Sequence, residues 1–355
     1  MTDLDQRIIQ TLRERAEGDV DTGRLLRGSR ALGRSRQLHR RVATGTALAL
    51  VGVLGFVAVA GTDLDGLTGR LPWTATTPTE ATPVPARVDG APGAAADPAL
   101  VGTDPQLLHF GLDPAKARYL SWAVAGDRSE AVRLSVAGGQ PVHVEVRNTP
   151  EFSIGLTLDG VSVEVAKPGP PTFDGTLQPT TGVAGGLVKS WRPAPGLYAR
   201  AVMLRGDRAG LERAVEALRW DEVRRCAAPL RLDALPEGAT LSACSVDVNS
   251  YPRLITAEFT VRRAETQYMW VRYRYASQAG TRTQGNRTIA GRPADLSPNG
   301  TTLELVGIPR TQVLADFGWP WEDDNRPTSF TEADATIVLA GARVIEDPTR
   351  LQSWE

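Results

Sequence analysis

Residues that catalyse reactions or ligate metals are scarce in this chain. It has two cysteines and three histidines among 355 residues. It also lacks the patterns G-x-S-x-G, H-E-x-x-H and G-x-x-x-x-G-K-[ST], which argues against a serine hydrolase, a zinc peptidase of that type and a P-loop nucleotidase. Two cysteines with no histidine nearby cannot supply four zinc ligands. The sequence therefore predicts no catalytic residue, no cofactor and no metal site.

An excess of charge of either sign is also missing. The 40 Lys and Arg side chains nearly balance the 41 Asp and Glu side chains, for a net charge of -1 at pH 7. A generally basic protein that binds nucleic acid is therefore not expected. The hydrophobic share of 41% is too high for a wholly disordered chain, and the length suits two domains or one domain with appendages.

One uncharged stretch, residues 42–61, reads VATGTALALVGVLGFVAVAG. As a helix it would be about 30 Å long, the thickness of the hydrocarbon core of a bilayer. Seven arginines and no acid precede it over residues 22–41, whereas Asp63 and Asp65 follow it. The positive-inside rule then places residues 1–41 in the cytoplasm and the rest outside. The sequence predicts a single-pass signal anchor in the plasma membrane, with the lipid bilayer as its partner.

Two alternatives concern this N-terminal part. The small residues Ala58 and Ala60 fit a signal-peptidase site, but the region before the apolar run is far longer than that of a secretory signal. An uncleaved anchor is therefore favoured over cleavage after Ala60. The Arg-rich tail, residues 1–41, is either a solvated end of the anchor or a docking segment for a cytoplasmic protein partner.

The rest of the chain changes composition twice. Residues 62–105 are rich in Thr, Pro and Ala, which predicts a disordered stalk. Residues 106–355 have an ordinary globular composition and form the predicted extracytoplasmic domain. Strands are expected over residues 131–136, 142–146, 196–204, 254–261 and 267–275, and a hairpin is expected around Asp159-Gly160.

Two helices are expected in this domain. Asp207 can cap a helix over residues 208–219, and Thr331 with Asp334 forms a capping box for a second helix. Each of two halves, residues 106–222 and 223–355, has strands followed by one helix. The expected fold class is α+β: a single transmembrane helix, then mainly antiparallel strands with one helix per half.

The two cysteines, Cys226 and Cys244, both follow the predicted membrane span. The outer compartment is oxidising, so the pair predicts one disulfide, with two buried free thiols as the alternative. His143 alternates with valines in its strand, which places it on the polar face of the sheet and not in a catalytic role.

One acidic and aromatic segment stands out as a ligand-binding candidate. It contains Trp319, Trp321, Glu322, Asp323 and Asp324. Its carboxylates could bind a cation and its indoles could stack on a sugar or a peptide. The alternative is an exposed acidic turn whose tryptophans pack back onto the domain.

The order of these parts resembles that of a known group of proteins. An Arg-rich tail (RERAEGDVDTGRLLRGSRALGRSRQLHRR, Arg13–Arg41), one membrane span, a Thr/Pro stalk and an outer domain are typical of actinobacterial single-pass membrane proteins of unknown function. The layout is also similar to that of membrane-bound anti-sigma factors, which implies a cytoplasmic segment that holds a sigma factor and an outer domain that senses the envelope. The zinc motif H-x-x-x-C-x-x-C of many such factors is absent, because residues 1–41 contain no cysteine.

Together these features favour a membrane-anchored, non-catalytic protein that binds or senses a ligand outside the bacterial cell. The alternatives are an anchored cell-envelope enzyme that works through carboxylates and a transmembrane regulator similar to an anti-sigma factor.

Overall fold

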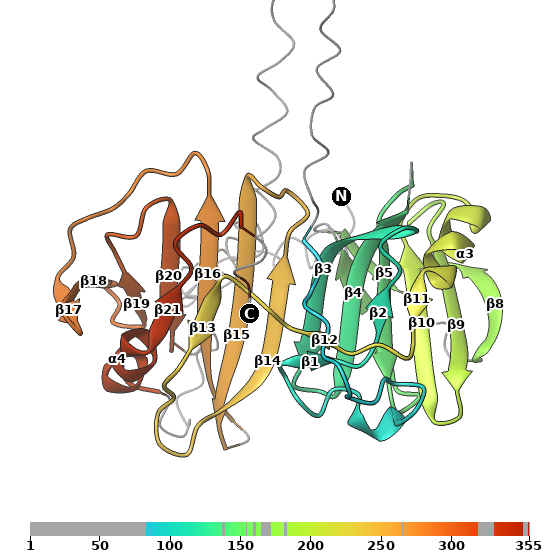
Figure 1. Ribbon diagram of the computed structural model, residues 1–355, viewed down its shortest axis with the longest axis horizontal. Helices are drawn as coiled ribbons and strands as arrows, with labels where there is room; N and C mark the ends of the chain where they lie inside the picture. The colour runs from blue at the N-terminus through green and yellow to red at the C-terminus, as the bar shows by residue number, and fades with distance from the viewer. Residues whose placement is uncertain are drawn as a thin grey trace, which may run out of the picture. The chain divides into compact units, whose positions relative to one another are not determined.

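The computed structural model describes residues 83–136, 139–153, 155–158, 161–164, 172–180, 183–264, 266–318, 330–350 and 354 (Figure 1). The predicted cytoplasmic tail, the predicted membrane span over residues 42–61 and the first part of the predicted stalk lie outside these residues. Within the described ranges, no helix is long and apolar enough to cross a membrane. The anchor therefore stays a prediction.

Strands dominate both halves of the described chain. The elements of the first half are η1 (Pro98–Leu100), β1 (Leu107–Leu108), β2 (Gly111–Leu112), β3 (Ala117–Ala125), β4 (Ser129–Val136), β5 (Val142–Arg147), β6 (Gly155–Leu158), β7 (Val161–Glu164), β8 (Asp174–Pro179), β9 (Leu187–Ala194), β10 (Leu197–Met203), α3 (Arg208–Glu216), β11 (Leu218–Arg219) and β12 (Arg224–Arg225). Those of the second half are β13 (Leu230–Leu232), β14 (Thr240–Asp247), β15 (Leu254–Arg263), β16 (Gln267–Ala276), β17 (Arg287–Ile289), β18 (Arg292–Leu296), β19 (Thr302–Leu305), β20 (Thr311–Asp316), α4 (Glu332–Ala340) and β21 (Ala342–Val344). The expected α+β class, with mainly antiparallel strands and two α-helices among the described residues, is confirmed.

The long strands form one antiparallel sheet in the order β17-β18-β19-β20-β16-β15-β14-β3-β4-β5-β10-β9-β8 (Figure 1). From its centre outward, the first half follows β3-β4-β5-β10 and the second half follows β14-β15-β16-β20. A helix comes after β10 in one half and after β20 in the other. Two small ladders match as well, because β2 pairs with β11 and β13 pairs with β21. The same chain path is therefore followed twice.

The two corresponding first strands, β3 and β14, join the halves at the centre of the sheet. They pair antiparallel, with Trp122 opposite Val246 and Ala123 opposite Ser245. Antiparallel pairing of equivalent strands is the contact that a two-fold axis generates between two copies of one unit. The second half thus continues the sheet of the first half without an interruption.

Strict alternation of side chains separates the two faces of the sheet. In β15, Ile255, Ala257, Phe259 and Val261 are buried, and the residues between them are partly exposed. The buried set packs with both helices in one hydrophobic core. Because successive side chains of a strand point to opposite faces, the residues between them, such as Thr256, Glu258 and Thr260, lie on the other face of the sheet. We call it the outward face.

The local predictions agree with these elements. The five strand ranges expected from alternation fall within β4, β5, β10, β15 and β16, each to within one or two residues. Strands β6 and β7 pair on either side of Asp159-Gly160, although the two turn residues lie outside the described ranges. Asp207 caps α3 by accepting a hydrogen bond from the Gly210 amide at 2.6 Å. Helix α3 ends at Glu216, earlier than expected, because Leu218–Arg219 pairs with β2.

The second capping motif is also confirmed. The Thr331 hydroxyl accepts a hydrogen bond from the Asp334 amide at 3.2 Å, and the Asp334 carboxylate accepts one from the Thr331 amide at 2.9 Å. Ala335, Val338 and Leu339 of α4 are buried against the sheet, as their spacing predicts.

The disordered stalk, predicted over residues 62–105, is wrong for residues 83–105. Ala94 and Val101 are completely buried, and the Gly102 amide donates a hydrogen bond to the Glu130 carboxylate at 2.8 Å. At Gly93, a Cβ atom would lie 2.5 Å from the Trp220 carbonyl oxygen. The Ala and Gly residues that suggested disorder instead allow the backbone to approach the domain closely, which composition alone does not reveal.

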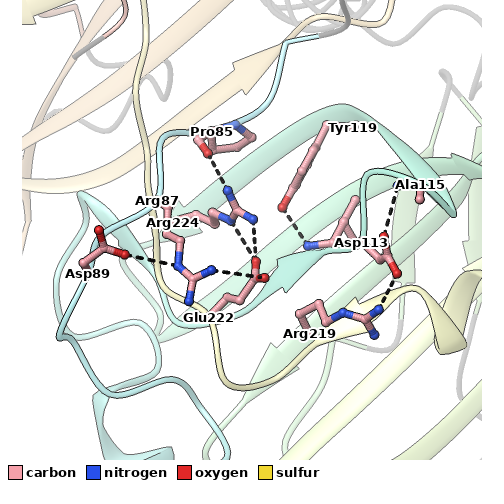
Figure 2. Close-up of polar contacts among 10 residues, drawn as sticks. Pro85, Arg87, Asp89, Asp113, Ala115, Tyr119, Arg219, Glu222 and Arg224 are labelled. Carbon is pink, nitrogen blue, oxygen red and sulfur yellow. Dashed lines mark hydrogen bonds and ion pairs between the residues drawn. The ribbon is translucent and has the colours of Figure 1, made fainter.

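The first described residues are held by charged groups next to β12 (Figure 2). Arg224 donates hydrogen bonds to the Pro85 carbonyl at 3.3 Å and to the Glu222 carboxylate at 3.0 Å. Arg87 lies 3.3 Å from Asp89 and 4.0 Å from Glu222. The chain at residues 85–89, within the predicted stalk, is therefore attached to the linker that joins the two halves.

Candidate functional site

A row of large side chains follows β16 on the outward face. Tyr268, Trp270, Arg272 and Arg274 alternate with the buried residues Met269, Val271, Tyr273 and Tyr275. The rings of Tyr268 and Trp270 are partly exposed and stacked, with centroids 6.4 Å apart and planes 19° apart. Aromatic rings at this spacing form a flat surface on which another ring could stack.

An ion cluster lies beside this pair. Arg272 donates from Nε to Glu258 at 2.7 Å and from Nη1 to Asp316 at 3.1 Å. The Arg272 side chain is 35% exposed and that of Glu258 is 41% exposed. Partial burial raises the pKa of Asp316, and the Arg272 guanidinium opposes that shift. We call Tyr268, Trp270, Arg272, Glu258 and Asp316 the open face.

The first half has an ion cluster at the corresponding place. Glu145 of β5 accepts hydrogen bonds from Arg200 at 2.7 Å and from Arg147 at 2.8 Å. One cross-strand row runs from Glu145 through Ala131, Ala123, Ser245 and Glu258 to Arg272. Glu145 and Arg272 thus lie on equivalent third strands, at equal distances from the centre of the sheet.

The cluster of the first half is covered by the chain itself. The Phe152 ring lies 4.8 Å from the Arg200 guanidinium carbon and 5.8 Å from that of Arg147. The Ser153 carbonyl accepts a hydrogen bond from Arg200 at 2.7 Å. The Arg200 side chain is only 3% exposed as a result. Among the described residues, no aromatic ring lies over Arg272 in this way.

The ligand segment expected from the sequence, with Trp319, Trp321, Glu322, Asp323 and Asp324, lies outside the described residues. The described chain reaches Gly318, two residues after Asp316, and Asp316 is the ladder partner of Trp270. The role of the predicted segment itself stays a prediction.

Sequence reasoning placed residues 267–275 in a strand but gave no binding role to Tyr268 and Trp270. The sequence did contain a pattern that predicts an aromatic surface, because aromatic residues two positions apart in a strand lie on the same face. The partners of Arg272 carry no such signal, since Glu258 and Asp316 belong to two other strands.

The predicted disulfide between Cys226 and Cys244 is confirmed. Their Cα atoms are 6.4 Å apart, and both residues are buried in the core. The bond joins the linker after β12 to β14. Because Cys244 points inward, the disulfide is part of the scaffold and not of the outward face.

The buried polar pair of His109 and Glu130 also belongs to the scaffold. Nδ1 of His109 lies 2.6 Å from Glu130, whose carboxylate also accepts the His109 amide at 2.6 Å. Both side chains are almost completely buried, so they hold the 102–109 segment and are not accessible to a substrate. Over the described ranges, no group of three His, Cys, Asp or Glu side chains is placed to hold a metal ion.

No protein-family model, no curated protein and no solved structure matches this chain.

Proposed function

We propose that this protein is a membrane-anchored, non-catalytic binding or sensing protein of the bacterial cell envelope, and that the open face binds its ligand. Residues 42–61 anchor it, residues 1–41 face the cytoplasm, and the described domain is extracytoplasmic. The Cys226–Cys244 disulfide supports this location, because such bonds persist mainly in exported proteins.

The observation that carries the proposal is the difference between the two halves. In the first half, Phe152 stacks on two arginines and Ser153 offers a carbonyl oxygen, so the sheet already binds a ring and a polar group at this position. In the second half, Arg272 at the equivalent position remains partly exposed beside two stacked rings. A ligand with a ring and hydrogen-bonding groups would make contacts of the same kind there.

The arrangement of charges supports binding more than catalysis. Both carboxylates of the open face are paired with the same guanidinium, and Glu258 is well exposed to solvent. A general acid or base usually acts in a site that excludes water. The open face instead offers hydrogen-bonding groups and rings on a rigid sheet.

The proposal is tested with the full chain in lipid nanodiscs, screened against arrays of cell-envelope glycans and extended peptides. We expect one ligand class to bind, with an affinity that falls about tenfold or more in Trp270→Ala. Trp191→Ala removes an indole of β9 that packs against Trp220 and the core, away from the open face. It is the control, and it should bind normally once its melting temperature shows that it is folded. Equal binding by Trp270→Ala and wild type would show that the open face is not the binding site.

A further inference from the structure

A small cavity adjoins the open face, at the far end of β16. Its volume is about 190 Å³, and its charged lining consists of Arg274, Arg282, Arg310 and Glu304. Pockets that enclose a whole drug-sized molecule measure about 300–1,000 Å³. This cavity therefore suits a single charged group and not a large cofactor.

Two of these arginines come from neighbouring positions in the sheet. Arg274 is an outward residue of β16, opposite Gln312 of β20, which also lines the cavity. Arg310 precedes β20 and has a φ of 56°, a left-handed conformation that is uncommon for a residue other than glycine. Its carbonyl accepts a hydrogen bond from the Ala276 amide at 3.0 Å, which ties its backbone to the end of β16.

The charges of the lining are not balanced. Arg282 is paired with Asp295 at 2.6 Å and with Glu304 at 3.4 Å, so the carboxylate of the cavity is already neutralised. Arg274 and Arg310 form no ion pair with any described residue, and both are exposed. Two guanidinium groups that line one cavity repel each other, and an anion between them would turn this repulsion into attraction.

We infer that this cavity binds a small oxyanion: a phosphate, a sulfate or a carboxylate group. Arg274 and Arg310 would provide the charge, and the amide of Gln312 would add a hydrogen bond. Arginine suits this role because its planar group donates two parallel hydrogen bonds to such anions. The anion would be either a free ion or the charged end of a larger ligand.

The position of the cavity links it to the proposed function. Trp270 and Arg274 are four residues apart on the same side of β16, which is about 13 Å along a strand. A ligand whose ring lies on the open face could therefore carry its anionic group into the cavity. Anion binding in the cavity is measured separately from ligand binding to the open face. A negative result for one proposal can therefore be distinguished from a negative result for the other.

The experiment uses isothermal titration calorimetry. Inorganic phosphate, sulfate and acetate are titrated separately into the full chain in nanodiscs at low ionic strength. We expect binding that weakens about tenfold in Arg274→Gln and in Arg310→Gln, and that is lost in the double variant. Arg118→Gln, which removes an exposed arginine of β3, is the matched control. Trp270→Ala should leave the binding of inorganic anions unchanged.

The affinity of wild type identifies the source of the anion. Micromolar binding of one inorganic anion indicates that the ion itself is the ligand, whereas millimolar binding lost in the double variant indicates the charged end of a larger molecule. The inference is overturned if none of the three anions binds, or if the double variant binds as wild type does. Melting temperatures verify folding, and they should not fall, because neither arginine has an ion-pair partner in the described chain.

Discussion

Glu145 of β5 and Arg272 of β16 lie in one cross-strand row of the sheet, each on the third strand from its centre. Their environments differ. The ion pairs of Glu145 are buried under Phe152, whereas those of Arg272 are partly exposed. Equivalent positions thus stabilise the domain in one half and provide an accessible surface in the other half.

The buried cluster should be essential for stability. Glu145→Gln keeps the volume of the side chain but leaves Arg147 and Arg200 without their shared anion. Uncompensated buried charge is costly, so we expect the free energy of unfolding to fall by about 3–5 kcal/mol, measured by urea denaturation. Arg208→Ala breaks an exposed pair with Glu212 and is the control, with an expected cost below about 0.5 kcal/mol. If the two variants lost a similar amount of unfolding free energy, the buried cluster around Glu145 would not be essential for stability.

Removing the disulfide should destabilise the domain without affecting the outward face. The bond closes a loop with a sequence separation of 18, which restricts the unfolded chain by about 3 kcal/mol. We expect Cys226→Ser with Cys244→Ser to lower the melting temperature and to leave anion binding in the cavity intact. Mass spectrometry of the exported protein checks the bond itself, and two free thiols there would refute the prediction.

Stability should decrease in mild acid because of His143. Burial lowers its pKa to about 4, helped by Arg200 and Arg133 and opposed by Glu145. The unfolded chain, with an ordinary histidine pKa of about 6.5, takes up the proton first. The contribution of His143 is therefore complete above about pH 6.5 and is lost as the pH falls toward about 4.

His143 is only partly buried, so solvent screening reduces the effect of its pKa shift on stability. We therefore expect it to contribute about 1–2 kcal/mol to this loss. Urea unfolding at about pH 7 and pH 4.5 measures the loss. His143→Gln should reduce the difference between the two values. An unchanged difference would mean that other groups cause the acid sensitivity.

The predicted topology is tested with a reporter that is active only outside the cytoplasm. Fused after Leu38, it should be silent, and fused after Glu355 it should be active, because arginine-rich flanks stay in the cytoplasm. Reversing the charge of the flank, by changing its arginines to glutamates over residues 22–41, should weaken or invert this result. Activity at both fusion points in the unmodified chain would exclude the anchor.

Local features of the domain could be predicted from the sequence alone. Alternation identified β4, β5, β15 and β16, and single polar residues, Asp207 and Thr331, identified where both helices begin. These features depend on interactions between residues that are close in the chain. The pairing of Cys226 with Cys244 was equally predictable, because no other cysteine is present.

Only the tertiary structure decided which distant residues meet. Glu145 meets Arg200 because β5 pairs with β10 and not with the strands that follow it in the chain. Arg274 and Arg310 line one cavity because β16 pairs with β20. Likewise, residues 83–105 are ordered through contacts with the distant Trp220 and Glu130. Strand order and close packing result from contacts across the whole domain, so no local pattern of residues could specify them.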